Sequence, residues 1–476
     1  MESSSAAMKP TGSSSSSGGV HVLLVPLPAQ GHMNPMIQFG RRLAYHGLLP
    51  TLVTTRYVLS TSPAAGAPFP VAAISDGFDE GGMASCSDPV EYCRRLEAVG
   101  SETLARAVDA EARAGRCPAV MVYDPHMPWV QRVAAAAGVP TAAFLSQSCA
   151  VDLIYGEAWA GRAPLPMTDA DGSALRRRGV VAVELAAEDL PPFVVAPELY
   201  PQYLKVSISQ FEFLADAADV FVNSFRDLEP LEAEYIETTW RAKTVGPALP
   251  SFYLDDGRLP SSNKTSGVSF FSSSSASAKT TMEWLDRQPP CSVVLASYGT
   301  VYTMDADELY ELGSGLCDSG RPFIWVVRSG EAQKLSQDLG ERCREKGLIV
   351  SWCPQLDVLS HKATGCFITH CGWNSTTEAI VAGVPMVGLP RSADQPTAAK
   401  YVESAWRIGL RMQLDEKGLV RREEVERCIR EVMEGERKDE FRQNAARWMK
   451  KAKEAMQEGG SSDKNIAEFA AKYLPK

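Results

Sequence analysis

Residues 352–395 read WCPQLDVLSHKATGCFITHCGWNSTTEAIVAGVPMVGLPRSADQ, and this pattern indicates the fold. Residues 365–369 form a short run of apolar and β-branched residues, which is typical of a buried strand. A glycine-containing turn follows, and Ser375 should then open an apolar helix that stops at Gly383. A strand, a loop and a helix in this order form the repeating unit of a parallel α/β sheet.

The loop of this unit carries side chains suited to an anionic ligand. In parallel sheets, ligands lie outside the carboxyl ends of the strands, and a helix N-terminus offers free N–H groups and about half a positive charge. His370 stands at the expected strand end, and Asn374 and Ser375 stand at the expected helix start. This arrangement predicts a diphosphate at the helix N-terminus.

Other residues of the stretch suit a nucleoside and a sugar. Trp352 offers a flat face for a base, while Asp394 and Gln395 offer carboxylate and amide groups to sugar hydroxyls. Taken singly, these residues have ordinary interpretations. Ser375 and Glu378 also fit a helix capping box. A lone Trp or His more often packs in the protein than binds a ligand. The combination favours a nucleotide-sugar site.

The whole stretch resembles the signature box of the plant secondary-product glycosyltransferases, the UDP-sugar-dependent family 1 enzymes. It has W-x-P-Q at its start, HCGWNS in its middle and DQ at its end, over the same 44 residues. The resemblance implies that UDP-glucose is the donor, because a closing Gln usually accompanies glucose. It implies the following donor-site residues: Trp352 and the backbone of Cys353 for uracil, Gln355 and Glu378 for ribose, His370, Asn374 and Ser375 for the diphosphate, and Trp373, Asp394 and Gln395 for the sugar.

The box departs from its family at two neighbouring positions. Relatives commonly have a Trp two residues before the Asp-Gln pair, where this chain has Ser392, and Arg391 replaces a frequent His. The missing ring removes a wall near the sugar and the acceptor. A transferase with altered donor preference and a non-catalytic nucleotide-sugar-binding protein are therefore the alternatives to a glucosyltransferase.

A second group of residues follows the apolar run VHVLLVPLP at residues 20–28, which is typical of a buried strand. His32 lies in the next loop, AQGHMNP, before an expected helix. A lone loop histidine is usually inert, but glycoside formation requires a base that accepts a hydroxyl proton near neutral pH. The family places its catalytic base in the same G-H-x-x-P context, which implies that His32 is the base.

Asp124 ends another apolar run, at residues 119–123, and fits the family's partner aspartate. It would orient the imidazole and stabilise the imidazolium. By itself it is also a plausible helix N-cap before Pro125. The resemblance further implies that Thr300 contacts a phosphate and that Ser146 approaches the sugar. The implied reaction is a direct inverting displacement that needs no metal and no cofactor beyond the donor substrate.

Composition supports a two-domain globular enzyme. The chain has 476 residues, is 45% hydrophobic and carries a net charge of −10, which argues against nucleic acid or an anionic membrane as partner. Eleven cysteines without a C-x-x-C pair indicate reduced thiols and a cytoplasmic protein. No apolar run approaches the ~20 residues that span a bilayer. A loose cluster lacks metal-ligand spacing and predicts no zinc site: Cys353, His361, Cys366, His370 and Cys371.

Alternating apolar runs and helical patterns predict an α/β fold with two Rossmann-like, doubly wound parallel sheets that face each other across a cleft, the GT-B arrangement of the family. Strands are expected near 20–27, 51–55, 119–123, 141–145 and 220–222, and five more in the second half. The expected boundaries are a disordered tail (1–19), an N-terminal acceptor-binding domain (20–246), a linker or mobile loop (247–279), a UDP-sugar-binding domain (280–457) and a C-terminal helix that packs back on the first domain (458–476).

The acceptor is the least determined part of the prediction. Met127, Phe78 and residues 211–214 are apolar candidates for its pocket, although they could equally be core. The motifs AISDGFDE and EGGSSDKNIAEF resemble a subgroup that glucosylates plant hormones, small phenolics and carboxylic acids, and cereal members act on trichothecenes. The chain is therefore expected to be a monomer that glucosylates a small lipophilic acceptor. Neither the G-x-S-x-G of hydrolases nor a G-x-G-x-x-G after a strand is present.

Overall fold

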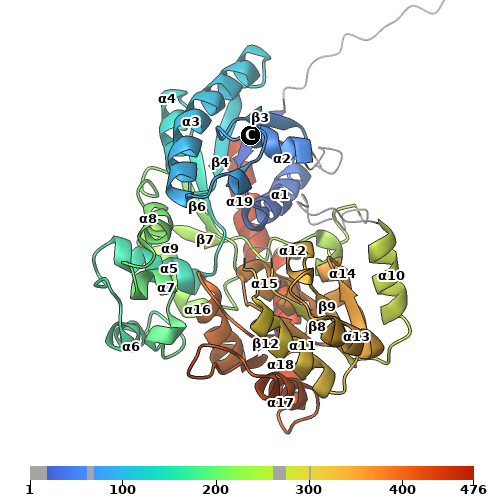
Figure 1. Ribbon diagram of the computed structural model, residues 1–476. Helices are drawn as coiled ribbons and strands as arrows, with labels where there is room; N and C mark the ends of the chain where they lie inside the picture. Colours follow the sequence, from blue (N-terminus) through green and yellow to red (C-terminus); the bar gives the residue numbers. More distant parts are fainter. Residues whose placement is uncertain (1–18, 62–68, 261–274, 300–301, 476) are drawn as a thin grey trace, which may run out of the picture.

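A computed structural model of the protein describes residues 19–61, 69–260, 275–299 and 302–475. The chain forms two parallel β-sheets, each with helices packed against it, and the two units lie one above the other in Figure 1. This is the predicted α/β class. Apart from Gly19, the tail predicted at residues 1–19 lies outside the described residues, as does Thr300.

The first sheet has seven parallel strands in the order β3-β2-β1-β4-β5-β6-β7. Its strands are β1 (Val20–Val25), β2 (Leu48–Thr55), β3 (Val71–Ile74), β4 (Pro118–Tyr123), β5 (Thr141–Leu145), β6 (Asp219–Val222) and β7 (Ala242–Thr244). The central strands β1, β4 and β5 are buried along most of their length because helices cover both faces of the sheet. The sequence patterns missed β3 and β7, the two edge strands, which are short and only partly buried.

The second sheet has six parallel strands in the order β10-β9-β8-β11-β12-β13. Its strands are β8 (Val293–Ser297), β9 (Phe323–Val326), β10 (Gly347–Val350), β11 (Thr364–Thr369), β12 (Met386–Gly388) and β13 (Gly409–Arg411). Five of these match the predicted runs. The sixth, β13, has three residues and no apolar run of its own, so the pattern could not reveal it.

Helices connect the strands on both sides of each sheet (Figure 1). In the first half they are α1 (Gln30–Tyr45), α2 (Arg56–Thr61), α3 (Pro89–Arg113), α4 (Trp129–Ala136), α5 (Cys149–Trp159), α6 (Asp169–Arg177), α7 (Pro192–Val195), α8 (Pro201–Ser209) and α9 (Pro230–Trp240). In the second half they are α10 (Ser275–Leu285), α11 (Ala306–Asp318), α12 (Ser329–Ala332), α13 (Gln337–Lys346), α14 (Gln355–Leu359), α15 (Trp373–Ala382), α16 (Gln395–Lys400), α17 (Arg422–Met433), α18 (Lys438–Met456) and α19 (Ser461–Tyr473). None of the described helices is long and apolar enough to cross a membrane.

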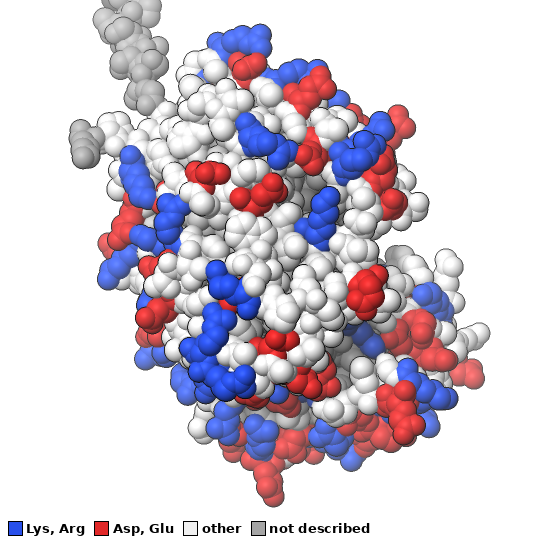
Figure 2. Space-filling view, turned by 90° about the vertical axis from the view of Figure 1, so that its left-hand side faces the viewer, with Lys and Arg blue, Asp and Glu red and all other residues white. Residues whose placement is uncertain are grey.

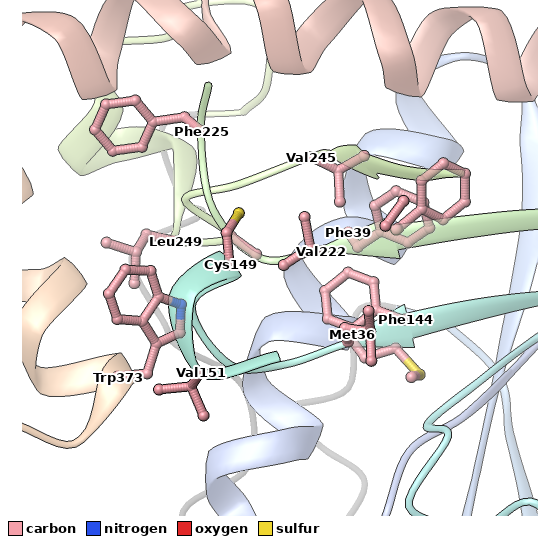
Figure 3. Packing of buried hydrophobic residues seen from close by; sticks show 14 of the residues in the cluster. Met36, Phe39, Phe144, Cys149, Val151, Val222, Phe225, Val245, Leu249 and Trp373 are labelled. Atoms are coloured by element: carbon pink, nitrogen blue, oxygen red, sulfur yellow. The ribbon is translucent and has the colours of Figure 1, made fainter. Parts of the chain in front are cut away.

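The hydrophobic core continues from one unit into the other. Trp373, from the second half, packs among residues of the first half such as Val151 and Leu249 (Figure 3). Its indole Nε1 donates a hydrogen bond to the carbonyl oxygen of Asn223 at 2.6 Å, and Trp406 Nε1 donates to the carbonyl of Leu228 at 3.0 Å. Burial of apolar area and satisfied indole N–H groups therefore hold the two units together.

The last helix, α19, packs on the first sheet. The ring of Phe469 lies 5.0 Å from that of Phe221 and 6.2 Å from that of Phe39, measured between ring centroids. Figure 1 shows this red helix among the blue and green elements of the first unit. The second half of the chain thus returns to the first domain before it ends.

The segment predicted as a linker or mobile loop is packed over its first part. A 3₁₀ turn, η4 (Ser251–Leu254), carries the buried side chains of Tyr253 and Leu254, and Tyr253 Oη donates to Asp357 Oδ1 at 2.6 Å. Residues 251–254 are thus packed against the rest of the protein, a contact that Pro and Ser content does not reveal, and the mobility predicted for residues 247–279 stays a prediction. Residues 261–274 lie outside the described residues.

An ion-pair network joins this segment to both ends of the chain. Arg42 of α1 pairs with Asp256, and its Nη1 also donates to the carbonyl of Met456 at 3.3 Å. Arg258 Nη2 lies 2.8 Å from Asp256 Oδ2 and 2.9 Å from Asp463 Oδ1. Arg42 is 3% exposed and Asp256 6%. The pair is therefore shielded from water on the side where α18 ends and α19 begins.

Charged side chains of both signs are interspersed over the face shown in Figure 2. This face shows no extended region of basic charge. Attraction of a polyanion by this face is therefore not expected.

Replacing Asp256 with Ala should destabilise the protein by about 3–5 kcal/mol, because the Arg42 guanidinium would stay buried without its ion-pair partner. Urea unfolding followed by circular dichroism measures this loss. The control is Glu102→Ala, since Glu102 pairs with Arg106 at a site where the two side chains are 68% and 64% exposed, and it should cost less than about 1 kcal/mol. An equal loss in the free energy of unfolding in the two variants would contradict the structural role given to Asp256.

Candidate active site

Three neighbouring strands of the first sheet deliver polar side chains to one edge. His32 follows β1, Asp124 follows β4 and Ser146 follows β5, and these strands pair side by side. The sequence predicted His32 in a loop, but α1 begins at Gln30 and His32 lies in its first turn. The prediction failed because Pro35 suggests a later start, whereas it lies inside the helix.

Pro35 also explains a contact between the two halves of the chain. A proline has no N–H, so the carbonyl of Gly31, four residues earlier, receives no hydrogen bond from it. This carbonyl instead accepts from Asn374 Nδ2 at 2.8 Å. The residue next to His32 is thereby tied to the predicted diphosphate site.

His32 and Asp124 form a short hydrogen bond. His32 Nδ1 lies 2.6 Å from Asp124 Oδ2, and their side chains are 24% and 1% exposed. Ser146 Oγ lies 3.1 Å from the same His32 nitrogen. Asp124 is not the N-cap of α4, which begins at Trp129. The structure thus brings together the predicted base, its carboxylate partner and the predicted sugar-side serine.

The charges of this pair are fixed by mutual contact. Burial acts to lower the pKa of His32, but the charge and hydrogen bond of Asp124 outweigh it and raise the pKa above its ordinary value. Burial would raise the pKa of Asp124, but the charges and hydrogen bonds of His32 and His126 hold it well below its usual range. An ionised Asp124 can only accept, so His32 Nδ1 is the donor and Nε2 of the neutral ring is free to take a proton.

On the second sheet, α15 begins at Trp373, two residues before the predicted start at Ser375. Its N-cap is Gly372, whose lack of a side chain leaves the first turn without a side-chain cap. The capping-box interpretation was therefore wrong. Ser375 Oγ and Glu378 Oε2 instead accept from Gln355 Nε2, at 3.0 and 2.7 Å. Burial raises the pKa of Glu378 to about 7 although Gln355 acts against this shift.

His370 follows β11, and two glycines flank its ring. A Cβ atom on Gly299 would lie 2.6 Å from His370 Cε1, and one on Gly372 would lie 2.4 Å from His370 Nε2. Burial, with a smaller contribution from the charge of Arg328, lowers the pKa of His370 to about 4. Its buried Nδ1 has no hydrogen-bond partner among the described residues. A neutral imidazole with an unsatisfied polar atom thus stands at the predicted diphosphate site.

Trp352 and Cys353 lie between the end of β10 and the start of α14, at the same edge of the sheet. Trp352 is partly exposed and Cys353 is buried. Burial raises the pKa of the Cys353 thiol to about 12, so the thiol is neutral. Their predicted roles, stacking on uracil and pairing through the backbone, stay predictions.

The predicted sugar-side residues are not all available to a sugar. Trp373 was expected to face the sugar, but its ring is 4% exposed and its indole N–H is bound to Asn223. The prediction was wrong for this side chain because the ring fills the core between the domains. Asp394 Oδ2 accepts from the backbone N–H of Trp373 at 2.9 Å, and burial raises the pKa of Asp394 to about 6. Gln395 Oε1 accepts from the N–H of residues 391 and 392, so only its amide nitrogen can donate to a sugar.

Arg391 and Ser392, the two departures from the family box, both make contacts with neighbouring residues. Arg391 Nη2 lies 2.7 Å from Glu308 Oε1, and its guanidinium lies 5.2 Å from the centroid of the Tyr302 ring. Its charge is therefore neutralised by Glu308. Ser392 is partly exposed, and its N–H is held by Gln395 at 3.1 Å.

Comparisons with known proteins agree with this geometry. The family model described as UDP-glucoronosyl and UDP-glucosyl transferase matches residues 274–450. UDP-glycosyltransferase 79 from Oryza sativa is 66% identical over 460 residues, which cover 96% of this chain and 98% of that protein. UDP-glucosyltransferase UGT13248 from Hordeum vulgare is 65% identical over 457 residues, covering 96% and 95%. The chain belongs to the plant UDP-glycosyltransferases of family 1.

Solved structures of the rice protein Os79 match this UDP-glycosyltransferase closely. The complex of Os79 with UDP gives a TM-score of 0.93 at 66% identity, over 95% of this chain and all of that chain. Another Os79 structure contains a trichothecene, with a TM-score of 0.90, and a third contains UDP and deoxynivalenol-3-glucoside, with a TM-score of 0.88. The predicted GT-B fold and the assignment as a UDP-glucosyltransferase are confirmed. The roles given to single site residues stay predictions.

A second histidine of this glycosyltransferase, His126, contacts Asp124 and was not among the residues predicted from the sequence. Asp124 Oδ1 accepts from both the backbone N–H and the ring Nδ1 of His126, each at 3.0 Å, and the rings of His126 and His32 lie 5.1 Å apart. The available signal was the spacing D-P-H, since an Asp often binds the backbone two residues ahead. His126 supplies two of the hydrogen bonds that keep Asp124 ionised.

These three side chains are also the only group of potential metal ligands found in the described part of the chain, with their ligand atoms within 4.8 Å of one another. The atoms satisfy each other by hydrogen bonds, so they need no ion to be stable in this geometry. The cysteine and histidine cluster around Cys353 forms no such group among the described residues. Independence from metal stays a prediction.

Replacing Asp124 with Asn should lower the pKa of His32, because burial would then act on the ring without the opposing negative charge. In the unaltered enzyme, kcat/KM for transfer should fall as the pH drops through a value above 6.5, since a protonated His32 cannot act as base. In the variant this fall should move to lower pH, and the rate at neutral pH should drop by at least about 10²-fold. A pH series of kcat/KM measures both effects.

The control is Asp76→Asn. Asp76 is equally buried, but it binds the backbone N–H of Phe78 and the hydroxyl of Tyr92, and its charge does not act on His32. This variant should keep the acidic limb of the pH profile where it is. An unmoved limb in Asp124→Asn would contradict the proposed coupling of the pair.

Proposed function

We propose that this enzyme transfers glucose from UDP-glucose to a hydroxyl or carboxyl group of a small lipophilic acceptor, with inversion at the anomeric carbon and without a metal ion. The observation that carries the proposal is the hydrogen bond from Asn374 to the carbonyl of Gly31. It places the first turn of α15, where a diphosphate would bind, against the turn of α1 that carries His32. The base and the leaving group would then meet across one sugar.

The reaction follows from the charges of these groups. His32 Nε2 takes the proton of the acceptor hydroxyl while the acceptor oxygen forms a bond to C1 of glucose. The bond between C1 and the diphosphate oxygen breaks on the opposite side, and UDP leaves. The carboxylate of Asp124 stabilises the imidazolium, as in a triad without its serine. The N-terminus of α15 and the polar atoms of His370 stabilise the charge on the leaving diphosphate.

We propose trichothecenes as the first acceptor class to test. The rice protein Os79, with 66% identity, has been solved with a trichothecene and with deoxynivalenol-3-glucoside. Detoxification is the role that such an acceptor would imply. The apolar residues first considered for the pocket do not argue for one acceptor, because Met127, Phe211 and Leu214 are core residues with 1–2% exposure. Plant hormones, phenolics and carboxylic acids are the alternative acceptors.

We further propose that the enzyme works as a cytoplasmic monomer. All eleven cysteines are free thiols, and seven of them are buried. Buried free thiols suit a reducing compartment. The monomeric state rests on the completeness of the candidate site within one chain.

Incubation with UDP-glucose and EDTA, with a panel of trichothecenes, phenols, carboxylic acids and flavonoids, should give UDP release and a mass gain of one hexose on at least one acceptor. His32→Ala should lose this transfer by about 10²–10⁴-fold or more, because the acceptor proton would have no base. UDP affinity, measured by calorimetry, should stay nearly unchanged. Full activity in His32→Ala would remove this residue as the base.

If no acceptor of the panel gains a hexose while UDP still binds, the result would favour one of the alternatives. These are a different sugar donor or a non-catalytic nucleotide-sugar-binding protein. Activity that requires added metal and is abolished by EDTA would contradict the metal-independent mechanism.

Replacing Ser392 with Trp should raise turnover or sharpen the preference for UDP-glucose over other UDP-sugars, because a ring at this position restores the wall common in relatives. The matched control is Ser392→Ala, which removes the hydroxyl without adding a ring and should change neither property. Relative kcat/KM values for several UDP-sugars measure the effect. No difference between the Trp and Ala variants would mean that Ser392 does not set donor selectivity.

A further inference from the structure

Asp152 is a buried carboxyl group that the mechanism above does not use. It lies in α5 and is 1% exposed. Neither of its carboxyl oxygens has a hydrogen-bond partner among the described residues. A buried polar group without a partner loses its hydrogen bonds to water, and native proteins keep few such groups without a reason. This group therefore indicates a ligand contact.

The position of Asp152 in the fold supports this interpretation. Its helix begins three residues after Ser146, whose Oγ lies 3.1 Å from His32 Nδ1. Ser148 caps the helix, and its carbonyl accepts from the backbone N–H of Asp152 at 3.0 Å. The adjacent Val151 packs toward Trp373 (Figure 3), whose backbone N–H binds Asp394. Asp152 thus stands in the first turn of α5, close enough to Asp124 and Asp394 for their charges to act on it.

The charged groups that act on Asp152 are all acidic: Glu229, Asp394 and Asp124. Burial comes first and these charges second, and both raise the pKa of Asp152 well above its ordinary value. Both effects favour the protonated carboxyl group over the carboxylate. A protonated carboxyl group has one O–H donor and one C=O acceptor, which matches the paired donor and acceptor of a hydroxyl.

Glu229 shows that a fully buried carboxyl group next to Asp152 can have hydrogen-bond partners at both oxygens. It lies close enough to raise the pKa of Asp152, but it accepts from the backbone N–H groups of Cys149 and Ala150 at 3.1 and 2.9 Å and from Ser224 Oγ at 2.5 Å. The protein thus satisfies the structural acid and leaves Asp152 free.

We propose that Asp152 is a further substrate-binding residue, whose carboxyl group hydrogen-bonds a hydroxyl of the glucose or of the acceptor where the two substrates meet. This inference rests on the proposed function. Both candidate ligands, the glucose and the acceptor, would offer a hydroxyl group to Asp152. Kinetics with altered substrates shows which of the two offers it.

Two variants separate hydrogen bonding from packing. Asp152→Asn keeps a donor and an acceptor, whereas Asp152→Leu removes both at similar volume. The Leu variant should raise the KM of one substrate by about tenfold, as expected for a lost buried hydrogen bond, and the Asn variant should stay within about threefold of the original enzyme. Asp152→Ala gives a second apolar replacement if the Leu variant fails to fold.

Altered substrates then identify the hydroxyl. If Asp152 binds the hydroxymethyl group of glucose, the penalty of the Leu variant should disappear with UDP-xylose, which lacks that group. If it binds the acceptor, the penalty should persist with UDP-xylose and disappear with an acceptor congener that lacks one hydroxyl. Either pattern supports the inference and names the contact.

The matched control is Glu232→Gln. Glu232 is also fully buried with a raised pKa, but it binds the hydroxyl of Tyr401 and the backbone N–H of Ala182, so its loss should affect stability and leave both KM values unchanged. A folded Leu or Ala variant with unchanged UDP affinity and unchanged KM for both substrates would overturn the inference. An equal rise in KM in the Asn and Leu variants would also overturn it, because this result would indicate a packing role. Absence of transfer in the unaltered enzyme would instead overturn the proposed function.

Discussion

The active arrangement depends on a buried interface between two sheets, held by side chains that reach the backbone of the other half. Trp373 binds the carbonyl of Asn223, Trp406 that of Leu228, and Asn374 that of Gly31. Each of these donors would lose its partner if the domains separated, and the two rings would lose their apolar contacts as well. The interface therefore fixes the distance between the base on one sheet and the anion site on the other.

Burial assigns different protonation states to chemically identical groups in this cleft. Asp124, with several hydrogen-bond donors around it, has a pKa held well below its usual range, while burial and nearby acidic groups raise the pKa of Asp152 well above its usual range. The same division separates the histidines, since a carboxylate raises the pKa of His32 and burial lowers that of His370. Pairs of groups whose environments push their pKa values apart indicate acid and base roles. The charge of Asp124 thus prepares His32 as a base before any substrate binds.

The loops that carry these groups adopt unusual backbone conformations. Cys371 and Ala393 both have positive φ angles, of 64° and 54°, directly beside His370 and Asp394. This conformation costs roughly 1–2 kcal/mol for a residue other than glycine. Such cost is commonly found where surrounding structure holds a functional loop in place. Here the buried contacts of Trp373 and Gln395 supply that surrounding structure.

The sequence by itself determined the fold class, ten of the thirteen strands and the identity of the residues at the strand ends. Apolar runs and the spacing of the 44-residue box are local properties, so they can be read directly from the sequence. It could not determine where a side chain points once two domains pack together. Trp373 lies inside the box but fills the interface, and the residues of the predicted linker are buried for the same reason.

Only the tertiary structure decided the partners of the charged groups. His126 joins Asp124 because a turn brings its ring back, Arg391 is neutralised by Glu308 of α11, and Asp152 has no partner among the described residues. Protonation in a buried site depends on every charge within a few ångströms, and most of those charges are far away in the sequence. The residue types of the site can therefore be read from short stretches of the sequence, whereas their protonation states follow from long-range packing.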